Sequence, residues 1–130
     1  MERSVMARIQ RAFEATDVAV TEARQLAQQT LAKVGLVSED VLMVVNELAA
    51  NAVSHVRQKF VLSLSTTPEQ VTVEVRDPSP VEPTVREPTD WAVGGRGMLL
   101  VSALARRWGV KQIPDDGKCV WAVVGLTPCA

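Results

Sequence analysis

Residues 38–77 decide the fold and read SEDVLMVVNELAANAVSHVRQKFVLSLSTTPEQVTVEVRD. The first half, as far as about Arg57, is apolar on almost every side, which is typical of a deeply buried helix. Ser38 can cap this helix, and acidic residues follow in its first turn, where they suit the positive end of the helix dipole. The period then changes to two, so residues 60–65 and 71–77 predict a β-hairpin. A buried helix followed by a hairpin indicates helices packed on a sheet.

The flanking segments extend the same two layers. Asp17 can cap a helix that runs to about Lys33, where Gly35 ends it. The other predicted elements are an edge strand or irregular arm, a third helix and two closing strands: residues 3–13, 98–107, 110–113 and 118–126. We therefore expect an α+β fold, a two-layer sandwich with helices on one face of a mostly antiparallel sheet.

The composition narrows the classes of function. A length of 130 residues predicts one domain, residues 1–130. Fourteen basic residues against fifteen acidic ones give a net charge of -1, so we expect no direct contact with nucleic acid. Neither a signal peptide nor an apolar stretch long enough to span a membrane is found. Two cysteines and one histidine do not form a soft metal site. These features predict a cytoplasmic protein.

The buried helix carries a polar stripe. At the helical period, five polar side chains share an arc with Val44: Glu47, Asn51, Ser54, His55 and Gln58. Burying a carboxylate and an amide without partners costs on the order of several kcal/mol. The stripe either faces water or lines a ligand cavity. In a cavity, Glu47 would be a base or water-orienting group and Asn51 an oxygen ligand for Mg²⁺.

Two further sites follow the hairpin. Asp77 ends a strand before Pro78-Ser79-Pro80, so it is either a turn former or an acceptor for a ligand amino group such as the adenine N6. Gly94-Gly95-Arg96-Gly97 precedes a helix, so it is either a flexible connection or an anion site. Arg96 would bind phosphate, pair with an acidic partner or be solvated. The loop comes too late for a dinucleotide fold, and no Gly-Lys-Ser/Thr follows for a P-loop.

Taken in order, these segments resemble the GHKL (histidine kinase-like ATPase) superfamily. Its N box, G1 box, G2 box and closing strand correspond to residues 47–55, 75–77, 94–98 with 104–109, and 117–122. The resemblance covers roughly residues 17–126. Among short members, the chain is most similar to the anti-sigma-factor serine/threonine kinases of bacteria. It departs from the family at Ser79, where Gly is usual, and at Cys119, where a Thr often helps bind adenine.

The resemblance implies a Bergerat-type sandwich that holds Mg-ATP between helices and sheet. It implies that Asn51 helps hold Mg²⁺, that Glu47 assists phosphoryl transfer and that Asp77 binds adenine. The phosphates would be contacted by the glycine segment: Gly94, Gly95, Arg96, Gly97 and Met98. Residues 78–93 would form a short lid.

The resemblance also implies partners. The chain would phosphorylate a serine on an anti-anti-sigma (STAS-type) protein and sequester a sigma factor, and a homodimer is the family expectation. The alternative is a non-catalytic binding module of the same fold that switches partners with weak or no ATP binding. A GHKL ATPase that only hydrolyses ATP fits less well, because such enzymes use additional domains.

Overall fold

The computed structural model describes residues 5–81 and 95–126. The elements in chain order are β1 (Ala7–Phe13), α1 (Asp17–Lys33), α2 (Glu39–Asn51), the π-helical turn η1 (Ala52–Val56), β2 (Phe60–Thr66), β3 (Gln70–Asp77), α3 (Gly95–Leu104), β4 (Arg107–Ile113) and β5 (Gly117–Gly125). Within these residues the strands form one antiparallel sheet in the order β1-β2-β3-β5-β4. The N-terminal segment is therefore an edge strand, one of the two predicted possibilities.

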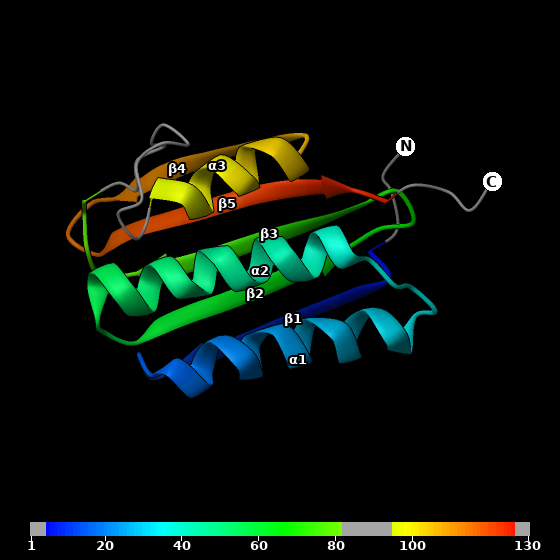
Figure 1. Cartoon of the computed structure of the whole chain (residues 1–130), viewed down its shortest axis with the longest axis horizontal. Coiled ribbons are helices and arrows are strands. Elements are labelled where there is room, and N and C mark those ends of the chain that lie inside the picture. Colours follow the sequence, from blue (N-terminus) through cyan, green and yellow to red (C-terminus); the bar gives the residue numbers. More distant parts are fainter. Residues whose placement is uncertain (1–4, 82–94, 127–130) are drawn as a thin grey trace.

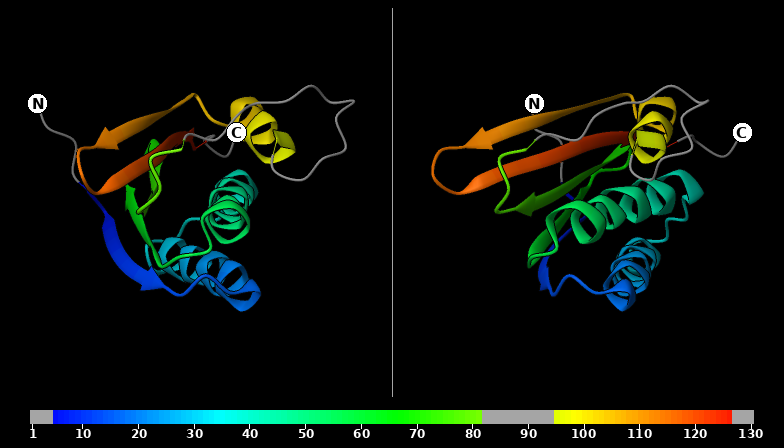
Figure 2. Two further views of the ribbon diagram at one scale, coloured as in Figure 1. Left: turned by 90° about the vertical axis from the view of Figure 1, so that its left-hand side faces the viewer. Right: turned by 60° about the vertical axis from the view of Figure 1, so that its left-hand side comes forward.

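The helices form a second layer on one face of the sheet (Figures 1 and 2). Helix α2 contacts both α1 and α3, so it is the central helix of its layer. The predicted α+β sandwich with a mostly antiparallel sheet is confirmed. In the described part of the chain, no helix has the length and apolar character needed to cross a membrane.

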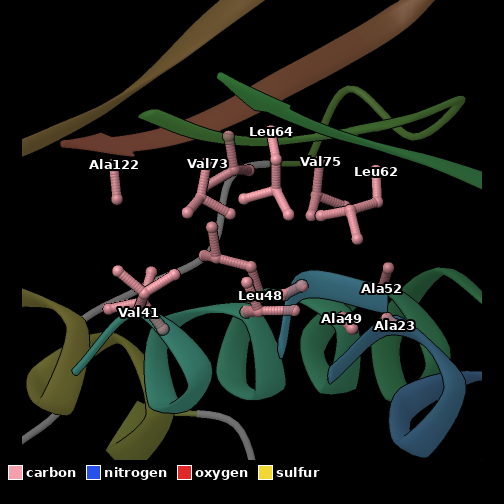
Figure 3. Close-up of a cluster of buried hydrophobic side chains, with 14 of the residues drawn as sticks. Ala23, Val41, Leu48, Ala49, Ala52, Leu62, Leu64, Val73, Val75 and Ala122 are labelled. Carbon is pink, nitrogen blue, oxygen red and sulfur yellow. The ribbon is translucent and has the colours of Figure 1, made fainter. Parts of the chain in front are cut away.

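The core lies between α2 and the inner face of the sheet (Figure 3). Alternate residues of β2 and β3 point inward, as the period of two predicts: Phe60, Leu62, Leu64, Val71, Val73 and Val75. From α2 they meet fully buried side chains such as Val41, Val45 and Leu48. Each of these side chains contributes about 1.5–3 kcal/mol through removal from water. This burial fixes the distance between the helix layer and the sheet.

The helix ends follow the sequence with one correction. The predicted cap Asp17 is the first residue of α1, and the cap is Thr16, whose Oγ1 accepts a hydrogen bond from Ala19 N at 3.2 Å. Gly35 stops the helix in the left-handed region, at a φ of +76°. Ser38 caps α2 as predicted, since its Oγ accepts from Val41 N at 3.2 Å.

The end of α2 differs from the prediction of a regular α-helix as far as Arg57. The α-helix ends at Asn51 and continues as the wider turn η1. Arg57 N donates to Ala52 O at 3.1 Å, five residues back, and Arg57 itself is left-handed with a φ of +57°. The wider turn breaks the spacing assumed for the polar stripe beyond Asn51. Ser54 and Gln58 are exposed.

Helix α3 lies about three residues earlier than the predicted 98–107. It begins at Gly95, and Arg107 already belongs to β4. Arg106 N donates to Val123 O at 2.8 Å, and Trp108 Nε1 donates to Ser102 Oγ at 2.7 Å. These bonds hold the segment at the sheet edge, which ends the helix before Arg106. Gly94 lies outside the described residues.

Candidate functional site

The predicted site residues gather at one end of the sandwich. Register pairs the start of β2 with the end of β3, because Val61 faces Arg76. The short link from η1 to β2 brings the end of the α2–η1 helix to the same place, next to β3. The turn between β4 and β5 and the start of α3 lie at this end too (Figure 1). The fold thus brings together the N-box helix, the end of β3 and the start of α3.

Glu47 and Asn51 come from the last turns of α2. They are four residues apart, so they lie on the same side of the helix. Both are partly buried, although the adjacent Leu48 and Ala49 are fully packed in the core. Part of the stripe is therefore neither fully exposed nor packed in the core, which is compatible with the predicted ligand cavity.

The side-chain nitrogen of Asn51 is buried and has no hydrogen-bond partner among the described residues. An unpaired buried polar group costs about 1–3 kcal/mol, so such a group calls for a specific explanation. A ligand at this position would provide one. The amide can also turn about its last bond and present its oxygen at the same position, which is the donor type that Mg²⁺ prefers. The π-helical turn that starts directly after Asn51 is of a kind frequent at functional sites.

The glycine segment begins α3 and does not precede it. Gly95, Arg96 and Gly97 form its first turn, where backbone N–H groups have no partner within the helix. This position still favours an anion, because free N–H groups and the positive end of the helix dipole coincide there. The side chain of Met98 is fully buried in the core, so a contact from Met98 to a ligand would come from its backbone.

Asp77 ends β3 as predicted, but its carboxylate is already engaged. Lys118 Nζ donates to Asp77 Oδ1 at 2.9 Å, and the two side chains are 4% and 3% exposed. Ser79 N donates to the same oxygen at 2.9 Å, and Ser79 O accepts from Lys118 Nζ at 3.0 Å. The strand register places Lys118 directly opposite Asp77. Gln112 Nε2 donates to Pro80 O at 3.1 Å and links the segment after β3 to β4, which lies beyond β5 in the sheet.

Cys119, which the sequence places at the position of the family's Thr, does not lie on the face of the sheet that the helices cover. Successive residues of a strand point to opposite faces, so Cys119 lies on the outer face of the sheet, opposite Arg76 and away from the helices. Its thiol donates to Glu74 Oε2 at 3.6 Å. Burial, together with the charge and hydrogen bond of Glu74, raises the pKa of Cys119 to about 11. The residue of β5 that faces Asp77 is Lys118.

The family of the chain follows from its match to the histidine kinase-like ATPase domain, which covers residues 13–124. The chain belongs to the histidine kinase-like ATPase domain family. The match includes the helix with Glu47 and Asn51, the strand that ends at Asp77 and the start of α3. Membership in a family of ATPase-like domains supports ATP binding.

A solved structure has a similar fold. It is the crystal structure of the RsbU and RsbW domains of Rv1364c from Mycobacterium tuberculosis, with a TM-score of 0.67 and 17% sequence identity. The similarity covers 92% of this chain and 33% of that one, so the chain spans about a third of its length. No curated protein matches the chain.

The residues present fit a nucleotide at one end of the site and not at the other. Toward α2 and α3, the Asn51 amide, whose nitrogen has no partner among the described residues, and the backbone N–H groups that are not bonded within the first turn of α3 suit a metal ion and phosphates. Toward the sheet, the acceptor expected for adenine is paired with a lysine of the same chain. Sequence reasoning missed Lys118. The signal was available, because Lys118 continues the inward-facing alternation of Val120, Ala122 and Val124.

Proposed function

We propose that the chain is an anti-sigma factor with ATP-dependent serine protein kinase activity, which phosphorylates an anti-anti-sigma protein of the STAS type and sequesters a sigma factor. Membership in the ATPase family and the likeness to a structure that includes an RsbW domain support this proposal. The observation that carries it is the buried side-chain nitrogen of Asn51, one turn after Glu47, which has no hydrogen-bond partner within residues 5–81 and 95–126.

Each residue would have a distinct task. Asn51 would hold the magnesium ion, and the N–H groups of Gly95, Arg96 and Gly97 would contact the phosphates. Bound Mg-ATP supplies the transferable phosphoryl group and a cation that balances its charge. Glu47 would orient the hydroxyl of the acceptor serine and take its proton, which requires a carboxylate within hydrogen-bond reach of that hydroxyl. Residues 82–94 hold most of the proposed lid and lie outside the described residues.

A non-catalytic partner-switching module of the same fold is the second candidate. The ion pair between Asp77 and Lys118 favours it, because a site whose base acceptor is already paired binds adenine weakly. In this case the helices and sheet would serve to hold partners, and ATP binding would be weak or absent.

One experiment separates the two candidates. The protein is incubated with radiolabelled ATP, Mg²⁺ and purified anti-anti-sigma proteins, and the products are tested for phosphoserine. Labelled serine on one of these partners supports the kinase. ATP binding without any labelled partner at saturating nucleotide contradicts the kinase and supports the binding module.

A further inference from the structure

A buried ion pair closes the sheet side of the site. Asp77 Oδ1 accepts from Lys118 Nζ and from Ser79 N, both at 2.9 Å. The ammonium group also donates to Ser79 O at 3.0 Å. Lysine is almost never fully buried unless it is paired, and here both charged side chains are almost completely removed from solvent. The chain itself therefore neutralises the carboxylate.

The backbone holds Lys118 in this position. Gly117 has a φ of +91°, and a Cβ there would lie 2.0 Å from Asp77 O, so only glycine allows β5 to start this close to the end of β3. The antiparallel register then sets Lys118 opposite Asp77 on the inner face. The lysine cannot turn to the outer face without a shift in register that would expose Val120 and Ala122.

Stability alone does not account for this pair. Replacing a buried ion pair by apolar side chains of similar volume is often neutral or stabilising, because burying two charges costs as much as their attraction returns. A buried pair at the end of a ligand site, on the strand position where the ligand's base is expected, is better explained by what it does to the ligand.

The pair changes which base the site accepts. The amine at C6 of adenine is a hydrogen-bond donor and needs an acceptor. Asp77 Oδ1 already receives two donors, and the adjacent ammonium has one N–H left beyond those that bond Asp77 and Ser79, which faces an incoming donor unfavourably. An oxo group at purine C6 would avoid this conflict.

We propose that Lys118 determines the base specificity of the nucleotide site by occupying Asp77, so that the C6 amine of adenine gains no net contact. This inference rests on the proposed nucleotide binding and deepens it. It implies that the parent protein binds ATP no more tightly than inosine triphosphate, which carries an oxo group at C6. Removing the ammonium would free Asp77 and create a preference for ATP.

The test compares the two nucleotides by calorimetry at equal Mg²⁺. The proteins are the parent, Lys118→Met and the control Lys111→Met, in which the same change is made at an exposed lysine of β4. We expect parent and control to bind ATP and inosine triphosphate within about threefold of each other. Lys118→Met should favour ATP by about 10–100-fold, the worth of a hydrogen bond to a charged acceptor. Tripolyphosphate, which has no base, should bind all three proteins equally.

Two results would overturn the proposal: a parent that already prefers ATP more than tenfold, or a folded Lys118→Met protein with the parent's ratio. If Lys118→Met does not fold, the ratio of the parent decides the question. The double variant Asp77→Asn/Lys118→Met provides a second check, because an amide can offer either its oxygen or its nitrogen and should bind both nucleotides alike. If neither parent nor variant binds any nucleotide, the proposed function fails together with the inference. If the variant alone binds, and prefers ATP, the inference is supported and the kinase proposal is contradicted.

Discussion

On its helix side, the candidate site has a buried amide nitrogen, that of Asn51, with no partner in the part of the chain that the structure describes. On its sheet side, the Oδ1 atom of Asp77 accepts hydrogen bonds from both Lys118 and Ser79. The helix side offers a ligand a buried polar group, and we call it the incomplete side. The sheet side presents a carboxylate oxygen that its own chain already pairs, and we call it the closed side. The comparison shows that the part of the site expected to bind metal and phosphates can keep a polar group available for a ligand. In the part expected to bind the base, the acceptor is already paired with a lysine of the same chain. The following predictions test this contrast.

The largest effect should come from Glu47 on the incomplete side. If this carboxylate orients and deprotonates the acceptor serine, Glu47→Gln should lower the rate of phosphoryl transfer roughly 10²–10⁴-fold, the usual contribution of a general base. Affinity for ATP should change little. The measurement is transfer of label to an anti-anti-sigma protein at saturating ATP. Glu22→Gln, at an exposed position of α1, is the matched control. A Glu47→Gln protein that transfers as fast as the parent would remove Glu47 from catalysis.

Variants on the closed side should mainly change the stability of the protein. Lys118→Met leaves Asp77 buried without its counter-ion, so the free energy of unfolding should fall by about 3–5 kcal/mol. Asp77→Asn/Lys118→Met removes both charges and should recover most of that loss. The exposed pair between Arg76 and Asp116, at 3.7 Å, is the contrast, and Arg76→Met should cost less than about 1 kcal/mol. Urea unfolding measures all three, and equal losses for Lys118→Met and Arg76→Met would contradict a buried pair.

The same contrast explains what the sequence could predict. The hydrophobic periods of α2, β2 and β3 determine which faces pack together, so the sandwich and the positions of Glu47, Asn51 and Asp77 followed from pattern alone. These positions depend on local spacing and on the layer architecture, both of which can be read from residues close together in the chain.

The remaining features depend on contacts between distant residues. The ion pair between Asp77 and Lys118 depends on the register of β3 against β5, and the two residues are 41 positions apart in the sequence. The π-helical turn after Asn51 does not follow from the propensities of its residues. The sequence places Cys119 at the position of the family's Thr, as a departure from the family, whereas the strand register decides which of two neighbours faces the helices, and that neighbour is Lys118.

Asn51→Ala should separate binding from stability on the incomplete side. The variant loses a contact to the metal ion, so Mg-ATP affinity should fall about 10–100-fold, as for other contacts to charged groups. Stability without ligand should change by less than about 1 kcal/mol, because no partner of the buried nitrogen is lost.

Asn46→Ala makes the same change on the same helix with the opposite expectation. Asn46 Oδ1 accepts from Arg24 Nη1 at 2.9 Å and links α2 to α1. Its loss should lower stability slightly and leave affinity unchanged. Calorimetry measures the Mg-ATP affinity of both variants, and thermal unfolding measures their stability. Asn51→Ala should lose mainly affinity, and Asn46→Ala should lose only stability. If Asn51→Ala binds Mg-ATP as the parent does, Asn51 is not a metal ligand.

The smallest effect should come from Cys119, on the outer face and away from both sides of the site. Burial first, and then the charge and hydrogen bond of Glu74, raise the pKa of its thiol from 9.0 to about 11. As pH rises past 9, the unfolded chain therefore loses this proton before the folded protein does. The contribution of the protonated thiol to the free energy of unfolding is fully present below pH 9 and is lost as the pH rises toward about 11. The unfolding temperature of the parent should therefore fall more steeply between pH 9 and about 11 than that of Cys119→Ala. The ATP affinity at neutral pH should be the same in both proteins. Identical pH profiles would contradict the raised pKa, and a change in ATP affinity would return Cys119 to the site from which the strand register excludes it.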